Sequence, residues 1–268
     1  MADSADIQIA NRDRFTFGEN WAQFLAVVDE KKVAAAEASL VEKFGDLGGL
    51  TFLDIGSGSG LFSLAARNLG AEVVSFDFDH QSVACARELQ HRFRPSDTSW
   101  RIEQGSALDS EYLDKLGKFD VVYSWGVLHH TGEMWHAIEL ASGCVKEGGQ
   151  VLLALYNDQG FISTWWTFVK RRYVRTGFLG KKLIYGTIGQ SLLIRARVND
   201  ILTHRDSNPT RGMDRKRDAI DWIGGYPFEV SKPSQVVSVI TSDGFTLEQQ
   251  WLVGRRLGCN EYLFKKNI

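Results

Sequence analysis

The sequence predicts an α/β fold in which a mostly parallel sheet carries helices on both faces. Three observations lead to this expectation. Short apolar runs alternate with stretches of helical periodicity between residues 50 and 156. A glycine-rich loop directly follows the first apolar run. Near the C-terminal end, two further apolar runs are separated only by Gly254-Arg-Arg-Leu-Gly258, and so short a connection favours an antiparallel hairpin at the end of the sheet.

Each expected element is bounded by residues that begin or end it, and glycines close several of the helices. The expected strands are 50–55, 72–77, 99–104, 119–124, 150–156, 245–253 and 259–264. The expected helices are 30–44, 61–69, 81–93, 134–145, 162–173, 181–202 and 234–242.

The alternation of strands and helices stops after Tyr156, which suggests how the chain is organised. Residues 157–228 contain helix-like stretches and no clear strand, so we expect a helical insertion there. The predicted parts are an N-terminal helical segment (1–48), a core (49–156), the insertion (157–228) and a C-terminal part (229–268) that completes the sheet.

Length and composition favour one globular domain with a sizeable insertion. The chain has 268 residues, of which 44% are hydrophobic and 24% charged, enough to bury a substantial core. Cys85, Cys144 and Cys259 are far apart, which argues against a disulfide framework or a cysteine metal site and favours the cytoplasm. We expect neither a signal peptide nor a transmembrane segment, because the chain begins with polar residues and lacks a long apolar run.

The glycine-rich loop is Asp54-Ile-Gly-Ser-Gly-Ser-Gly60, and its glycines allow a ligand to approach the backbone closely. A dinucleotide fingerprint fails in both registers, because its third glycine would fall on Leu61 or Ser63. This spacing argues against an NAD-dependent oxidoreductase, and no P-loop motif is present. Asp54 would repel phosphates but suits the positive charges of S-adenosylmethionine (SAM).

Asp77 ends the second expected strand, 21 residues after Gly56. A carboxylate at this position can accept hydrogen bonds from both hydroxyls of a ribose. NAD and SAM sites share this feature, so Asp77 predicts a nucleoside ligand without choosing between the two.

The stretch from Leu53 to Tyr156 resembles the class I SAM-dependent methyltransferases, especially the branch of ubiquinone-biosynthesis and other small-molecule enzymes. The matching motifs are LDIGSGSG at 53–60, VVSFD at 73–77, GSALD at 105–109, FDVVYSWGVLHH at 119–130 and the Gly148-Gly149 turn. The resemblance implies a Rossmann-like sheet of seven strands, with the last strand antiparallel and inserted between two others. It does not specify the methyl acceptor.

The resemblance also implies which residues contact the cofactor. The methionine end would be lined by Gly56, Ser57, Gly58, Ser124 and Trp125, the ribose would be held by Asp77, and the adenine would be bordered by Phe78, Ser106, Ala107 and Leu108. Many relatives have aspartate in place of Ser106, and a serine there makes a weaker contact with the adenine amine. The aromatic segment that ends at Trp21 either folds over the cofactor or packs on the sheet.

The candidate catalytic residues follow the fourth and fifth expected strands. Methyl transfer needs an aligned acceptor and, for some acceptors, a base. His129 and His130 are the first candidates for the base, because histidine titrates near neutral pH. Tyr156 is a candidate for orienting the acceptor. The alternative for each is a structural role, in a cap, the core or a turn. The chemistry requires no metal, and we expect none.

The insertion is predicted to select the acceptor. Residues 157–229 contain 13 Lys and Arg against 7 Asp and Glu, a net charge of +6 in a chain of −2. This contrast favours an anionic acceptor, although a solvated face, a homodimer contact or a shallow membrane contact would also explain it. The candidate acceptor-binding residues are Asn157, Trp165, Arg171 and Tyr226.

The sequence therefore predicts a SAM-dependent methyltransferase that acts on an oxygen or nitrogen of a small, anionic metabolite or sugar-type acceptor. A nucleic-acid or protein methyltransferase is one alternative. The pI of about 6.3 and Ser124-Trp-Gly-Val in place of an Asn-Pro-Pro-Tyr motif argue against nucleic acid. A SAM-binding protein without catalysis is the other alternative.

Overall fold

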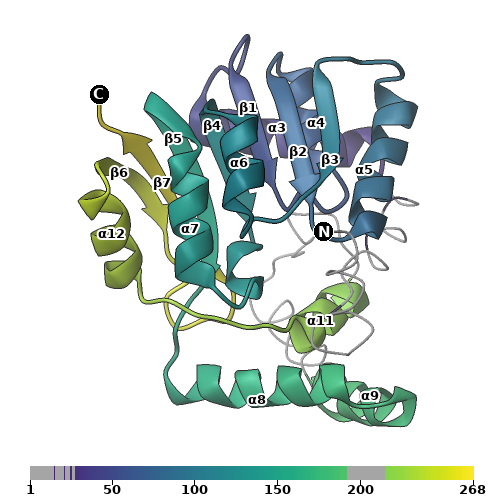
Figure 1. Cartoon of the computed structure of the whole chain (residues 1–268). Coiled ribbons are helices and arrows are strands. Elements are labelled where there is room, and N and C mark those ends of the chain that lie inside the picture. Colours follow the sequence, from purple (N-terminus) through teal and green to yellow (C-terminus); the bar gives the residue numbers. More distant parts are fainter. Residues whose placement is uncertain (1–14, 16–20, 22–24, 26–27, 192–214) are drawn as a thin grey trace.

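The computed structural model describes residues 15, 21, 25, 28–191 and 215–268. Its centre is one seven-stranded sheet with the strand order β3-β2-β1-β4-β5-β7-β6, and helices cover both faces (Figure 1). This confirms the predicted fold class. None of the helices within the described ranges is long and apolar enough to span a bilayer.

The strands and helices lie close to the expected positions. The strands are β1 (Thr51–Ile55), β2 (Glu72–Asp77), β3 (Trp100–Gln104), β4 (Phe119–Trp125), β5 (Val145–Tyr156), β6 (Phe245–Trp251) and β7 (Cys259–Lys266). The helices around the sheet are α3 (Glu30–Phe44), α4 (Leu61–Asn68), α5 (His80–Phe93), α6 (Ser110–Leu116), α7 (Met134–Gly143) and α12 (Pro233–Ser242), with a 3-10 turn at Leu128–His130. The sequence analysis did not predict α6, because one short helix has little periodicity; Asp109 caps its first turn.

The antiparallel strand lies inside the sheet. β1 pairs in parallel with β2 and β4, and β4 pairs in parallel with β5. β7 pairs antiparallel with both β5 and β6, so β6 forms the edge. The hairpin suggested an antiparallel strand at the end of the sheet, whereas the resemblance correctly implied its insertion. Strand order reverses between β1 and β4, and ligands of such sheets bind at this crevice.

The two faces of the sheet bury separate apolar clusters. Along β1, Phe52 points to the face covered by α3, α4 and α5, whereas Leu53 and Ile55 point to the face covered by α6, α7 and α12. This alternation follows from the two-residue repeat of a strand. Burial on both faces explains why the central strands read as continuous apolar runs.

The insertion begins with α8 (Phe161–Arg175) and α9 (Phe178–Ile184), continues as a π-helical segment (Tyr185–Gly189), and returns to the sheet through α11 (Arg215–Gly224). Figure 1 shows α8 and α9 in a row beyond the end of the sheet, with α11 between them and the strands. The expected helix 181–202 is thus already helical from 178. Its part beyond residue 191 lies outside the described residues.

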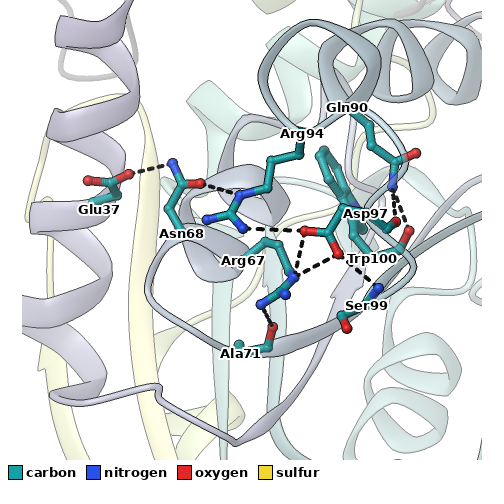
Figure 2. A network of polar contacts seen from close by, with 9 residues as sticks. All are labelled: Glu37, Arg67, Asn68, Ala71, Gln90, Arg94, Asp97, Ser99 and Trp100. Atoms are coloured by element: carbon teal, nitrogen blue, oxygen red, sulfur yellow. Dashed lines mark hydrogen bonds and ion pairs between the residues drawn. The ribbon is translucent and has the colours of Figure 1, made fainter.

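A polar network fixes the connection between α5 and β3 (Figure 2). The Asp97 carboxylate accepts hydrogen bonds from Arg67 Nε (3.2 Å to Oδ1) and from the Ser99 N–H (2.9 Å), and it forms ion pairs with Arg67 (2.9 Å) and Arg94 (3.4 Å). Burial raises the pKa of Asp97, but the Ser99 N–H and the Arg67 guanidinium outweigh burial and hold this pKa below its usual value. Asp97 therefore joins α4 to the start of β3.

We predict that Asp97→Asn lowers the free energy of unfolding at pH 7 by about 1 kcal/mol, because Arg67 loses its half-buried anionic partner. A lowered carboxyl pKa stabilises the fold above the unfolded value of 3.8, and this contribution is lost as the pH falls through the folded value. The gap between wild type and variant should therefore shrink near pH 3. Urea unfolding at both pH values tests this, with the exposed Asp243→Asn as control. A gap that does not depend on pH would contradict it.

Candidate active site

The glycine loop after β1 is tied to the end of β2. The N–H groups of Gly56 and Ser57 both donate to the Phe76 carbonyl, at 2.9 and 3.1 Å. The Gly58 N–H donates to Asp77 Oδ2, and the Asp79 N–H donates to Asp77 Oδ1, each at 2.9 Å. A carboxylate has about four acceptor positions, so each Asp77 oxygen can accept a second hydrogen bond. The loop and the acid predicted to bind a nucleoside thus lie side by side.

Close approaches explain why two positions in this loop are glycine. Gly56 has a φ of +74°, and a Cβ there would lie 2.3 Å from Val127 Cγ1. Gly58 has a φ of +55°, and a Cβ there would lie 2.8 Å from the Trp21 indole. Ser57 Oγ is buried and lacks a hydrogen-bonding partner among the described residues. A buried hydroxyl normally has a hydrogen-bonding partner. A polar ligand bound at the glycine loop would supply one for Ser57.

Asp54 lies beneath the loop. Its side chain is buried, and Oδ2 accepts a hydrogen bond of 2.5 Å from the Ser63 hydroxyl of α4. The carboxylate therefore connects the end of β1 to the helix that follows the loop. A role in attracting the positive charges of SAM would act through this position, and it stays a prediction.

The remaining predicted cofactor residues lie at the ends of β2, β3 and β4. Phe78 and Ala107 are half-buried, and Ser106 Oγ accepts from the Leu108 N–H (3.2 Å). Ser124 is buried and donates to the Ile55 carbonyl (3.2 Å). Trp125 Nε1 donates to Glu261 Oε1 of β7 (3.0 Å). The structure thus gives the side chains of Ser124 and Trp125 defined partners within the sheet, and their contact with a cofactor stays a prediction.

The three candidate catalytic residues come together at the ends of β4 and β5. The His129 and Tyr156 rings lie 3.9 Å apart between centroids, and the His130 and Tyr156 rings lie 5.4 Å apart. Val127, which packs against Gly56, immediately precedes the turn that carries both histidines. The glycine loop and the histidine pair are therefore joined by direct packing.

His129 is completely buried, and its Nδ1 accepts a hydrogen bond from the Tyr156 N–H (3.3 Å). Burial, together with the charges of His130 and Lys170, holds the pKa of His129 well below its usual value. His129 is thus a neutral side chain that fixes the end of β5, and this environment favours His130 over His129 as the group that meets an acceptor.

His130 has a defined tautomer. Its Nδ1 lies 2.6 Å from the Pro227 carbonyl oxygen. A carbonyl oxygen only accepts, so Nδ1 carries the proton and the lone pair of the neutral ring is on Nε2. This is the arrangement that a histidine base requires.

The segment 226–231 closes over the histidine pair. The Glu229 N–H donates to the His129 carbonyl, and the Ser231 N–H donates to the Tyr156 carbonyl, both at 3.0 Å. The Glu229 carboxylate accepts from the Met134 N–H at the start of α7, and burial raises the pKa of this carboxyl. Tyr226 is half-buried, and its carbonyl accepts from the Phe15 N–H (3.0 Å). These hydrogen bonds therefore hold the segment around Tyr226 next to the two histidines.

Sequence reasoning missed Lys170. Its side chain is completely buried, and Nζ donates to the Trp222 carbonyl. Nζ also lies 4.6 Å from the centroid of the Phe228 ring and 5.6 Å from that of the Tyr156 ring. The sequence did offer one signal: a lysine four residues after Trp166 on α8, and therefore on the same buried face of the helix.

The other predicted acceptor residues lie apart from the histidines. The Asn157 amide donates to the Gly254 carbonyl and accepts from Asn260 Nδ2, which holds the start of β7. Trp165 is on the exposed side of α8. Arg171 lines a surface groove of about 350 Å³, together with Asp158, Gly160, Ser163, Thr164, Thr167, Phe168 and Val230. Arg195, Arg197 and Arg211 of the insertion lie outside the described residues. Across the described ranges, we find no cluster of three or more potential metal ligands.

Comparison with known proteins finds similar proteins for part of this chain. Residues 53–153 match a family described as a methyltransferase domain. Ubiquinone biosynthesis O-methyltransferase of Pseudomonas paraeruginosa is 31% identical over 124 residues, which cover 44% of this chain and 49% of that protein. Residues 53–153 are thus similar to methyltransferase domains, in agreement with the resemblance carried by the motifs in this stretch. The chain spans about half the length of the curated relatives it matches.

Solved structures share the methyltransferase fold across most of the chain. Magnesium protoporphyrin IX methyltransferase from Synechocystis PCC 6803, with bound SAH, aligns with a TM-score of 0.54 and 16% identity, and covers 88% of this chain and 83% of that one. An O-methyltransferase family protein from Burkholderia thailandensis also gives 0.54, with 15% identity and coverages of 85% and 55%. At these identities, the comparison establishes the fold.

We predict that Gly56→Ala destabilises the methyltransferase domain more than Gly45→Ala does, by about 1–3 kcal/mol. Both glycines have a φ of +74°, but a Cβ at Gly45 would meet nothing within 4 Å, whereas one at Gly56 would overlap Val127. The two positions are thus matched in φ and differ in the overlap with Val127. Urea unfolding measures it, and Val127→Ala in the Gly56→Ala background should restore part of the loss. Equal effects at the two glycines would contradict this explanation.

Proposed function

We propose that this chain binds SAM at the glycine loop and transfers its methyl group to an oxygen or nitrogen of a small, anionic acceptor held beside His130 and Tyr156. The observation that carries the proposal is the hydrogen bond between the Gly58 N–H and Asp77, because it brings the loop and the ribose-binding acid together at the switch point of the sheet. The cytoplasmic location suggested by the cysteines remains part of this proposal.

The residues at the loop fit the cofactor. Gly56 and Gly58 lack a Cβ that would overlap Val127 and Trp21, and the buried Ser57 hydroxyl offers a hydrogen-bonding group. The Asp77 oxygens can accept from a ribose, and Trp21 lies against Gly58, where its indole would contact the ligand. When bound, SAM supplies an electrophilic methyl group on a sulfonium.

We expect Asp77→Asn to weaken binding of S-adenosylhomocysteine by at least about tenfold, since two charge-assisted hydrogen bonds to the ribose are replaced by neutral ones. Isothermal titration calorimetry of the whole chain measures this affinity. A separate titration with NADH tests the alternative class of cofactor. Asp243→Asn, an exposed carboxylate far along the sequence, is the matched control and should bind like wild type. No binding of S-adenosylhomocysteine by wild type, or tighter binding of NADH, would refute the cofactor assignment.

His130 is the proposed base. Its Nδ1 lies against the Pro227 carbonyl, so Nε2 is the ring nitrogen that would take the proton from the acceptor. The Tyr156 ring lies edge-on to His130 and orients the bound acceptor. The buried His129 supports Tyr156 and His130. Its Nδ1 accepts a hydrogen bond from the Tyr156 N–H, and its ring packs against both of their rings.

Two features support a negatively charged acceptor. Residues 157–229 carry a net charge of +6. Within that segment, the buried Lys170 ammonium lies 5.6 Å from the centroid of the Tyr156 ring, where it would attract an anion bound beside the tyrosine. A screen with labelled SAM should therefore favour carboxylated or phosphorylated acceptors over their neutral esters.

With an acceptor from that screen, we expect His130→Gln to lower kcat by about 10²–10⁴-fold while the affinity for S-adenosylhomocysteine stays close to wild type. The physical reason is the loss of the proton acceptor without a change in the glycine loop. Steady-state kinetics and calorimetry give the two quantities. His136→Gln, on the exposed side of α7, is the control histidine. An unchanged kcat would remove His130 as base, and cofactor binding without turnover of any acceptor would favour a non-catalytic SAM-binding protein.

A further inference from the structure

The outward sides of α8 and α9 expose a concentration of large apolar side chains. Thirteen such residues are exposed in the described part of the chain, and seven of them belong to these two helices. Their exposed fractions lie between 43% and 84%. They are Phe161, Ile162, Trp165 and Phe168 on α8, and Phe178, Leu179 and Leu183 on α9. We call these seven residues the apolar stripe.

The apolar stripe is separate from the core of the insertion. Phe161, Trp165 and Phe168 are spaced at i, i+4 and i+7, which places them on one face of α8. The opposite face of α8, which includes Trp166 and Tyr173, is buried against α11 and the end of β5. The helix is therefore apolar on two sides, and the second side is not needed to pack the insertion onto the sheet.

The same outward surface is strongly basic. Residues 161–191 contain no Asp or Glu and six Lys and Arg, of which Lys170 is buried and the other five are exposed or partly exposed. Arg172 continues the α8 face at i+11 from Phe161, and Lys182 lies between Leu179 and Leu183 on α9. Both basic side chains are exposed. Cations beside exposed aromatic residues match a surface that is apolar within and anionic at its boundary.

We propose that α8 and α9 dock this chain onto an anionic lipid surface, with the apolar stripe at the level of the acyl–headgroup boundary and the lysines and arginines beside the lipid phosphates. Large exposed apolar patches mark protein or membrane contacts, and the absence of any acidic residue over 161–191 favours the anionic membrane. The two helices lie in a row at the end of the molecule (Figure 1), an arrangement in which both can lie along one membrane surface.

The proposed contact adds to the proposed function without depending on it. The groove lined by Phe168 and Arg171 opens beside the apolar stripe, and the other face of α8 packs against the residues that surround Lys170 and Tyr156. Docking through the stripe would hold the acceptor side of the protein close to the membrane surface.

Vesicle flotation of the whole chain tests the inference. We expect binding to vesicles in which phosphatidylglycerol replaces about a third of the phosphatidylcholine, and binding at least about tenfold weaker to phosphatidylcholine alone or in high salt. The stripe variant Phe161→Ser/Trp165→Ser/Phe168→Ser should lose about tenfold or more in affinity for the anionic vesicles. Arg172→Gln/Lys182→Gln should weaken binding and its dependence on salt.

The matched control is Val41→Ser/Val239→Ser/Leu252→Ser, which removes three exposed apolar side chains elsewhere and should bind vesicles like wild type. Circular dichroism and S-adenosylhomocysteine titration establish that each variant is folded. If wild type does not bind anionic vesicles at low salt, or if the stripe and control variants bind equally, the inference is overturned. If sedimentation shows a wild-type dimer that the stripe variant loses, without vesicle binding, the stripe is a homodimer contact instead. Vesicle binding without S-adenosylhomocysteine binding would refute the proposed function alone.

Discussion

The close approach of the glycine loop to the end of β2 is the constraint on which the rest of the site depends. The loop backbone must come within hydrogen-bonding distance of both Phe76 and Asp77, and only residues without a Cβ allow this next to Val127 and Trp21. Val127 in turn leads into the turn that carries both histidines. One packing contact therefore sets the spacing between the cofactor end and the acceptor end of the crevice.

The acceptor end is built from buried polar groups that hold one another in place. His129 receives the Tyr156 N–H, Pro227 fixes the tautomer of His130, and Lys170 is enclosed by aromatic rings and bonded to the Trp222 carbonyl. Buried polar groups are costly without partners, so this arrangement tolerates little displacement. Its rigidity favours precise placement of an acceptor beside the histidine.

The insertion has two chemically different sides. Its inner side contributes Lys170 and the aromatic residues that close the site, and its outer side exposes the apolar stripe with its basic neighbours. A sequence average over the insertion shows only a net positive charge. Among the described residues of the insertion, helix geometry buries one cation, Lys170, and exposes others, such as Arg172 and Lys182.

The sequence by itself determined the fold class, the strands, most helices other than α6 and α11, the glycine loop and Asp77, because periodicity, glycine spacing and a strand-ending acid are local signals. Even α3 was predicted with its observed bounds, Glu30–Phe44. Only the tertiary structure decided the burial of His129, the partner of His130 and the place of Lys170. These depend on contacts between segments far apart in the chain, such as 129–130 with 226–229, and no local pattern encodes such contacts. Trp165 and Trp166 show the limit most clearly: they are neighbours in sequence, yet helical geometry directs one outward and buries the other.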